Sequence, residues 1–583
     1  MKPRVLGPVR DQGGFALESA IFTMVIATAV MAVLLSAAIT TLRTASMEVG
    51  NTRVNYAAEA GAESAIAQLM VAVEDGYLSD DDLSTLSPPS LTGFTFDSFS
   101  VTRVGGVVVE PITDGTFAGL SALTQQVDIY TEAKDPSGNS AASIVTAKAQ
   151  AIPIFQFGVF YDQDLEITNA PLMTFDGWVH TNANLYLNSN NAYYKDQVTA
   201  TGGVYRDHKY KHAVRTGIYI ADATGSDVYM DFDSRTDPLP DDFRAKSESY
   251  FDSRLRTAAH GVDTLRLPLP VGMPPEEIVA PRIGTDGTLE RNTKWAWKAD
   301  LYAVVDLDHS SIHNTTNQCA AITFTRPAGL SSPTNTECNT FFSFDWEQFV
   351  EGREDRMIDV LNLDVDKMYD WVATNPTNNA VSLLYVEFVG DGLASAGADG
   401  TVFEVLRVTN ASTLDDPLTI ATGWPMYTLG DFNSVGWQPA ALVADVITFL
   451  SNAWSDAANA GPTWSAMQNA SNTTVFAAVM AGHSAAPCDH EVAPCASVVQ
   501  SGGAFENFPR HLEKWSGVTF QYRGSIVSLF NPVHALMPWY HRVYYAPPIR
   551  DWLYDTRFRD PANLPPGTPV VGNVLQTAYR PVH

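Results

Sequence analysis

The chain has 583 residues, of which 45% are hydrophobic and 17% charged, as is typical of a folded protein too long for one compact core. Its formal net charge of −29 has no local basic cluster to offset it, which argues against a nucleic-acid-binding protein. We therefore expect two to four domains that do not bind nucleic acid.

The first predicted element is an apolar helix near the N-terminus. No charged side chain occurs between Ser19 and Leu42, and these 24 positions would form a helix of about 36 Å, enough to cross a bilayer. Lys2, Arg4 and Arg10 precede this run, and such a basic flank stays on the cytoplasmic side of a membrane. The run exceeds the roughly 7–15 apolar residues of a cleaved secretory signal, so we expect an anchor with the rest of the chain exported.

The helical pattern continues beyond this apolar run. Small or apolar side chains recur at helical spacing at Val54, Ala57, Ala58, Gly61, Ala65 and Leu69. No proline interrupts the chain between residues 15 and 73. We predict one helix over residues 15–75, with its first half in lipid and its second half packed on a soluble domain.

The residues at the start of this helix resemble those of a known family. A short basic leader ends in Gly13-Gly14 and is followed by Phe15, Glu18 and the long helix, which together resemble a type IV pilin precursor. The small-residue stretch 56–69 is similar to the same helix in PilX-type minor pilins. The resemblance implies that residues 1–14 are a leader removed by a prepilin peptidase.

In the pilin family, a glutamate at mature position five neutralises the terminal amine of a neighbouring subunit. Cleavage after Gly13 would place Glu18 at position five, and cleavage after Gly14 would place it at position four, so both cut sites stay open. Pairing with an ammonium relieves the high cost of an isolated carboxylate in hydrocarbon. The resemblance thus implies that Glu18 is the filament-assembly charge, and the alternative is a plain membrane anchor with an incidental glutamate.

The exported part reads as rich in β-structure. Residues 76–152 predict a small antiparallel β domain, with a hairpin around the turn at 135–138. In residues 153–205, short alternating strands are broken every 8 to 12 residues by polar turns, which fits a β-solenoid or a sandwich, and we favour the solenoid. Residues 206–410 are a mixed insertion of unknown fold, and residues 411–583 a C-terminal β-rich domain. The predicted fold class is α+β.

Two blocks of this region resemble segments of other pilin-like proteins. One block, within 155–205, carries a G-x-V-H-x-N-x-N segment formed by Gly177, Val179, His180, Asn182 and Asn184. The other block covers the C-terminal part of the chain from residue 418. The resemblance assigns no chemistry to either block.

The cysteines occur as two close pairs. Export and pairwise proximity favour the disulfides Cys319–Cys338 and Cys488–Cys495, with reduced thiols as the alternative. Cys488 and Cys495 lie close to His483 and His490, which leaves zinc as a second alternative, but the spacing matches no common zinc module.

Two further segments resemble catalytic or metal-binding motifs without matching them. The segment VMAGHSAAP places Ser484 in a setting similar to a hydrolase nucleophile elbow, but Ala486 replaces the last glycine and Pro487 follows it. The segment DLDHSSIH over 306–313 gathers carboxylates and imidazoles that we interpret as exposed polar residues. We predict no catalytic residue, metal or cofactor.

The resemblance implies a non-enzymatic minor pilin or pilus-assembly protein. Its partners would be other pilin subunits, the prepilin peptidase and the bacterial inner membrane, with the bulk of the chain periplasmic or on an extracellular pilus. The alternative is a membrane-anchored envelope adhesin or carbohydrate-active protein with its active surface on the β-solenoid.

Overall fold

The structure is a computed structural model. It describes residues 13–72, 78, 80–169, 171–209, 213–265, 269, 272–390, 402–460, 463–464, 467–486, 501–539 and 543–582. Most of the predicted leader, as well as Cys488, His490 and Cys495, therefore lies outside the described residues.

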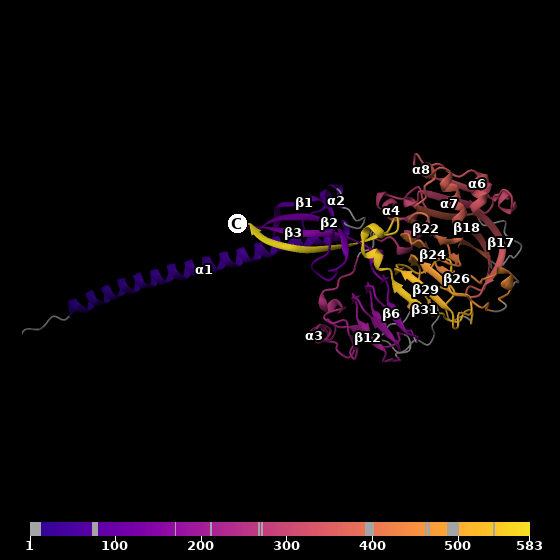
Figure 1. Cartoon of the computed structure of the whole chain (residues 1–583). Helices are drawn as coiled ribbons and strands as arrows, with labels where there is room; N and C mark the ends of the chain where they lie inside the picture. Colours follow the sequence, from indigo (N-terminus) through magenta and orange to yellow (C-terminus); the bar gives the residue numbers. More distant parts are fainter. Residues whose placement is uncertain are drawn as a thin grey trace, which may run out of the picture.

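The N-terminal helix α1 (Gly13–Ala72) is long and extends well beyond the rest of the molecule (Figure 1). Among the described residues, one helical stretch, Ala16–Met70, is long and apolar enough to cross a membrane by length and composition, with a mean hydropathy of 2.4 in its most apolar window. A large β-rich region follows it. The predicted α+β class with a long apolar N-terminal helix is confirmed.

The second half of α1 packs on a small antiparallel sheet that follows the short helix α2 (Asp80–Thr85). The sheet consists of β1 (Thr95–Pro111), β2 (Ser121–Lys134), β3 (Ser140–Pro153) and β32 (Val570–Val582), in that order. The prediction for 76–152 omitted the fourth strand, and the prediction for 411–583 placed it in another domain. The sequence pattern of β3 shows which face of the strand is buried, but not which distant strand pairs with its free edge. That strand is β32, with Pro153 opposite Val570 and Ala142 opposite Val582.

The remaining chain forms a large body built around one sheet, called the main sheet here. Within the described residues its eleven strands are, in spatial order, β14 (Leu255–Arg256), β10 (Val198–Ala200), β7 (Val179–Thr181), β4 (Val159–Tyr161), β30 (Ile526–Ser528), β28 (Ala478–Ala481), β25 (Ala440–Ala444), β22 (Leu418–Thr422), β19 (Leu383–Val389), β15 (Leu301–Asp306) and β16 (Ile322–Thr325). All neighbours are parallel except β15 and β16.

The order of these strands shows how the chain is threaded. The chain enters the main sheet in its middle at β4, and successive coils add β7, β10 and β14 on one side. It then crosses to the far side, enters at β15 and returns coil by coil until β30 pairs with β4, with Ile526 opposite Val159. In the first run, from β4 to β14, and in the second, from β15 to β30, each new strand adds on the same side of the strand before it. At the joint between the two runs, β30 pairs with β4 in parallel.

Each turn of the chain also carries short strands outside the main sheet, and these strands form shorter ladders on the other faces of the body. The first run carries β5 (Leu165–Ile167), β8 (Leu185–Leu187) and β11 (Val204–Tyr205) on one face, and β6 (Met173–Phe175), β9 (Ala192–Tyr194), β12 (Ile218–Ala221) and β13 (Asp227–Tyr229) on the next. The second run carries β17 (Phe342–Glu351), β18 (Arg356–Asp364), β20 (Val402–Thr409), β23 (Met426–Leu429) and β26 (Ile447–Leu450), and then β21 (Ala411–Thr413), β24 (Phe432–Val435), β27 (Thr473–Phe476), β29 (Thr519–Gly524) and β31 (Ile549–Tyr554).

The helices outside α1 and α2 are short and lie in the connections. They are α3 (Pro240–Phe251), α4 (Thr288–Thr293), α5 (Trp295–Lys298), α6 (Asn335–Phe341), α7 (Val365–Thr374) and α8 (Pro376–Asn379), with 3₁₀ turns η1 (Ile154–Gln156), η2 (Ala258–His260), η3 (Pro275–Val279), η4 (Ser310–His313), η5 (Gln318–Ala321), η6 (Asp456–Asn459), η7 (Phe505–Asn507), η8 (Thr556–Arg559) and η9 (Pro561–Asn563).

The main sheet is buried on both faces. On β25, Leu442 points into the core enclosed by the coils, whereas Ala441 and Val443 point to the opposite face. That opposite face is covered by the crossover between β14 and β15, which contributes Trp295 among others to its core. Burial on both faces explains why β25 and β28 read as continuous apolar runs rather than alternating strands.

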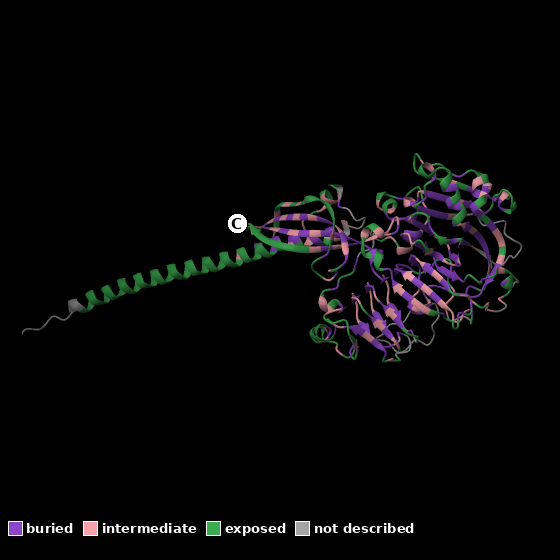
Figure 2. Ribbon diagram, viewed as in Figure 1, coloured by how far each residue is buried: buried purple, intermediate pink, exposed green. Residues whose placement is uncertain are grey.

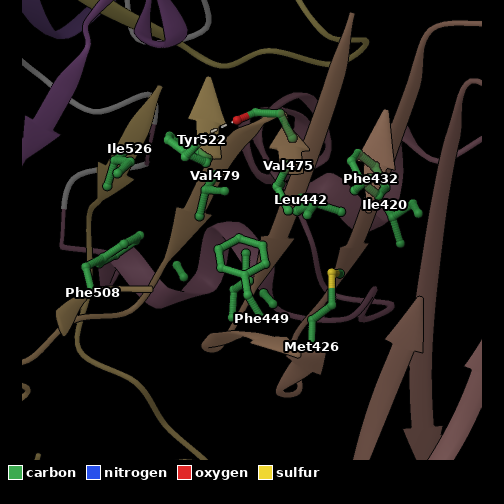
Figure 3. Close-up of a cluster of buried hydrophobic side chains, with 14 of the residues drawn as sticks. Ile420, Met426, Phe432, Leu442, Phe449, Val475, Val479, Phe508, Tyr522 and Ile526 are labelled. Carbon is green, nitrogen blue, oxygen red and sulfur yellow. Dashed lines mark hydrogen bonds between the residues drawn. The ribbon is translucent and has the colours of Figure 1, made fainter. Parts of the chain in front are cut away.

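The core inside the coils is formed by residues from both runs (Figure 3). Ile420, Leu442 and Val479 come from neighbouring strands of the main sheet, and Phe449 and Val475 face them from other ladders. Strands from all three predicted regions, 153–205, 206–410 and 411–583, share these sheets, since the middle region supplies β12, β15, β19 and β20 to them. Sequence periodicity identifies strands but not the distant strands with which they pair.

Candidate functional site

The exposed half of α1 is the most prominent apolar surface in the described part of the chain. From Ala16 to Val49 every side chain is exposed, including Leu17 at 66%, Phe22 at 69% and Leu34 at 64% (Figure 2). Apolar surface on this scale marks a membrane or protein contact, because water is an unfavourable solvent for it.

The threonine hydroxyls on this surface are satisfied within the helix. Each threonine hydroxyl donates to the carbonyl four residues earlier, as Thr23 does to Ser19 at 2.7 Å and Thr28 to Met24 at 2.6 Å; Thr40, Thr41 and Thr44 bond in the same way. The backbone and the threonine hydroxyls thus need no water, which suits a helix that lies in lipid or between other helices.

Glu18 lies in the second turn of α1 as the first charged residue of the described chain, and its side chain is exposed. The helix already includes Gly13, Gly14 and Phe15, but the side-chain positions of these residues lie outside the description. The predicted processing site therefore stays a prediction.

The second half of α1 packs on the small sheet through small residues. Val54, Ala57, Ala58, Gly61, Ala65 and Leu69 are all buried, as the helical spacing predicts. A Cβ at Gly61 would lie 2.5 Å from Cε1 of Phe96 and 3.2 Å from Cγ2 of Thr131, so the sheet approaches the helix closely at this position. The hydroxyl of Thr131 donates to the carbonyl of Ala58 at 2.7 Å.

Further contacts lie at both ends of this helix–sheet interface. A Cβ at Gly50 would lie 2.6 Å from Nδ2 of Asn139, at the tip of the predicted β2–β3 hairpin. Near the other end, the Gln68 amide donates to the carbonyl of Ser87 at 2.8 Å and accepts from its N–H at 3.1 Å. Neither Thr131 nor Gln68 was predicted from the sequence; the signal for Thr131 is a hydroxyl at an inward position of an alternating strand.

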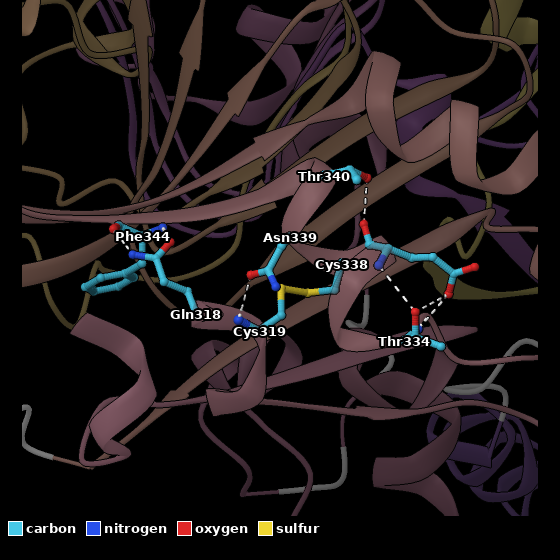
Figure 4. The surroundings of a disulfide bond; sticks show 8 residues. Gln318, Cys319, Thr334, Cys338, Asn339, Thr340 and Phe344 are labelled. Atoms are coloured by element: carbon cyan, nitrogen blue, oxygen red, sulfur yellow. Dashed lines mark hydrogen bonds between the residues drawn. A yellow bond between two sulfur atoms is a disulfide. The ribbon is translucent and has the colours of Figure 1, made fainter. Parts of the chain in front are cut away.

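One predicted cysteine pair lies within the described residues. Cys319 of η5 and Cys338 of α6 form a disulfide with a Cα–Cα distance of 5.9 Å, and both are fully buried (Figure 4). Flanking residues hold the two turns in place: the Cys319 N–H donates to Asn339 at 3.0 Å, and the Gln318 amide exchanges hydrogen bonds with the backbone of Phe344. The pair Cys488–Cys495 lies outside the described residues.

The segments that resemble catalytic motifs have structural contacts instead. Ser484 lies in a loop after β28, and its carbonyl accepts from the Gly502 N–H at 2.6 Å. Asp306 accepts from the Asp308 N–H at 3.0 Å, and the ring of His313 stacks on Trp346. In the described part of the chain, no group of three or more His, Cys, Asp or Glu side chains is placed to hold a metal ion.

The G-x-V-H-x-N-x-N segment also has a structural role. His180 is fully buried, and its ring nitrogens bond Thr199 at 2.8 Å and Asn182 at 3.0 Å. The Asn182 amide donates to the carbonyl of Leu265 in the crossover at 2.8 Å. Burial lowers the pKa of His180 to about 4, so the ring is neutral and ties a coil to the crossover without carrying charge.

No protein-family model and no curated protein matches this sequence. Among solved structures, the crystal structure of the competence-associated pilin ComZ from Thermus thermophilus aligns with 92% of this chain and 98% of its own length, at 12% sequence identity and a TM-score of 0.24. A TM-score this low does not establish a common fold, so the alignment carries no weight for function. The structure itself defines the class: an α+β protein with an exposed apolar N-terminal helix ahead of a large β-rich region.

Proposed function

We propose that this protein is a pilin-like filament subunit that acts by assembly rather than catalysis. The observation that supports this most strongly is α1, a continuous helix whose first half is exposed and apolar and whose second half is seated on an antiparallel sheet. Such a helix is held in the inner membrane before assembly and packs among the helices of neighbouring subunits after it.

The exported body favours a minor or capping position. It is much wider than the helix that precedes it (Figure 1). Identical copies stacked closely along a filament would collide at the body, whereas a copy at the tip or at intervals would not. This position suits a PilX-type minor pilin, with the body displayed outside the cell or in the periplasm.

We infer that the body is a β-solenoid. Its support is the step between paired strands: Val159 lies opposite Val179 and Val179 opposite Val198, which are steps of 20 and 19 residues. The ladders on the second face keep similar steps, with Leu165 opposite Leu185 and Leu185 opposite Val204. A solenoid would give the filament a stiff appendage, because each coil is packed on its neighbours.

The assembly chemistry we propose centres on Glu18. After a prepilin peptidase cuts beside Gly13 or Gly14, Glu18 pairs with the terminal amine of an adjacent subunit. Replacing Glu18 with Gln would leave that ammonium unpaired in an apolar bundle. Breaking a buried ion pair costs about 3–5 kcal/mol, and each 1.4 kcal/mol changes an association constant about tenfold.

The test is to compare Glu18→Gln with the matched control Glu48→Gln, which removes the same charge farther along the exposed half. We expect both variants to be inserted and to give the same mature N-terminus by intact mass. In sheared filaments we expect Glu18→Gln to be depleted by about a hundredfold or more relative to wild type, and Glu48→Gln to be recovered normally.

Equal recovery of Glu18→Gln and wild type would remove the assembly role and favour a plain membrane anchor. Loss of the whole apolar segment from the mature protein would remove the filament proposal altogether, since the assembling helix would be gone.

A further inference from the structure

The body contains a polar cavity beside the joint where β30 meets β4. The main sheet continues across this joint. Beside it β31 lies against β6, where the Tyr554 N–H donates to the side chain of Asp176 at 2.7 Å. The ladder β11–β8–β5 does not continue and ends at β5. In the described part of the chain, the segments after β28 and after β30 form loops, not strands, next to β5. A cavity of about 390 Å³ lies between β5 and these loops.

The lining of this cavity is polar with two aromatic side chains. From the first run it includes Glu166, Thr168, Asn169, Asn188, His208 and Arg215. From the loops of the second run it includes Glu506, Asn507, Trp539, Tyr545 and Arg550. The volume lies within the range of roughly 300–1,000 Å³ that is usual for small-molecule sites.

Two buried acceptors in this lining lack a donor. Glu166 is 5% exposed, and its Oε1 makes no hydrogen bond; Nδ1 of His208 lies 3.7 Å from it. Asn188 is 1% exposed, and because its Nδ2 donates to the carbonyl of Ala213 at 2.7 Å, its Oδ1 is the unpaired end. Buried acceptors without a donor are costly and call for a ligand or ordered water.

The same lining also offers an unused donor. Nε of Arg550 makes no hydrogen bond, although another guanidinium nitrogen donates to the carbonyl of Glu506 at 2.8 Å. The best ligand therefore both donates and accepts hydrogen bonds, as a hydroxyl group does. Trp539 and Tyr545, both partly buried, add the apolar surface on which the C–H face of a sugar ring packs.

We propose that this cavity binds a neutral mono- or disaccharide, with Glu166 and Asn188 accepting from its hydroxyl groups and Arg550 donating to them. A phosphate or carboxylate fits less well, because it would bring more acceptors to the unpaired oxygens of Glu166 and Asn188. The proposal does not depend on filament assembly, since every residue that it uses lies in the exported body.

The proposal is tested on the full-length protein in a detergent that has no sugar headgroup. The probes are glucose, galactose, mannose, N-acetylglucosamine, cellobiose, maltose and N,N′-diacetylchitobiose, with inorganic phosphate as the charged comparison. Binding is measured by titration calorimetry and by saturation-transfer NMR. We expect at least one sugar to bind with a Kd of about 1 mM or tighter and phosphate not to bind.

Variants then locate the binding site. We expect Glu166→Gln and Trp539→Phe each to weaken sugar binding about tenfold or more, and Glu248→Gln on the exposed face of α3 to leave it unchanged. Trp539→Phe keeps an aromatic ring at a partly exposed position, so it gives an answer even if Glu166→Gln fails to fold. Absence of binding by every sugar, or sugar binding that neither variant weakens, would overturn the proposal.

Discussion

At the scale of single residues, burial decides the charge of several side chains in the body. His511 is 1% exposed, and neither ring nitrogen makes a hydrogen bond within the described residues. Its ring is surrounded by Trp515, Phe520 and Tyr545, with centroid distances of 5.1, 5.0 and 6.2 Å. Burial first, and the nearby Arg550 charge second, lower the pKa of His511 to about 3.

A lowered imidazole pKa predicts a specific loss of stability in acid. The unfolded chain binds a proton at His511 below about pH 6.5, whereas the folded chain does so only near pH 3, so stability present above pH 6.5 is lost as the pH falls. For one such group the loss at pH 5 is about 2 kcal/mol.

We therefore expect His511→Phe to lose about 2 kcal/mol less stability than wild type between pH 8 and pH 5. Denaturant unfolding at the two pH values measures this difference. His309→Asn, at an exposed histidine that caps the N–H of Ser311, should follow wild type. The same pH dependence in His511→Phe and wild type would show that His511 does not titrate as argued.

At the scale of elements, α1 combines two surfaces in one helix. Its first half is exposed over the whole circumference, and its second half has a buried stripe on the small sheet. Close approach at the stripe depends on Gly61, where glycine costs some helix propensity but leaves room for Phe96 and Thr131.

A larger side chain at Gly61 is expected to loosen the packing of α1 on the small sheet. Gly61→Leu should destabilise the packing of α1 by about 1–3 kcal/mol, since an overpacked contact forces side chains or backbone to move. Hydrogen exchange of residues 54–69 in the full-length protein measures this, and exchange there should become faster.

The matched control is Glu59→Leu, which adds the same side chain at an exposed position two residues earlier. It should leave exchange unchanged. Equal protection in Gly61→Leu and wild type would mean that Phe96 can move aside without cost.

At the scale of the whole molecule, two long-range pairings close the fold. β32 returns from the C-terminus to the edge of β3, and β30 returns to β4. Val574 of β32 also joins the core beneath α1. The small sheet on which α1 packs is therefore complete only after β32 has been synthesised.

This closure predicts the effect of a short deletion. Removing residues 570–583 should expose the edge of β3 and remove Val574 from the core, so β1–β3 and the second half of α1 should become sensitive to proteases. The body should stay resistant, because the β4–β30 joint is intact. Removing only residues 580–583, which takes away the partners of Ala142, Ser143 and Ile144 but leaves Val574 in the core, is the control. Uniform resistance of the longer deletion would show that β3 does not depend on β32.

Features that depend on a local pattern could be predicted from the amino acids alone. The charge-free run and the spacing from Val54 to Leu69 are sufficient to predict α1 and its buried stripe, since helical periodicity is set by residues three and four apart. The strands between residues 153 and 205 were predictable because alternation of apolar and polar side chains along a strand is also a local pattern.

Which distant segments meet depends on the packing of the complete fold. The partner of β3 is more than four hundred residues away, and the neighbour of β4 is β30, because apolar strands of similar length can pair in many ways until the whole core is packed. The polar cavity follows from the same long-range order. Glu166 and Asn188 are unremarkable in the sequence, and they face a space that exists because two coils from the other end of the chain carry loops beside β5.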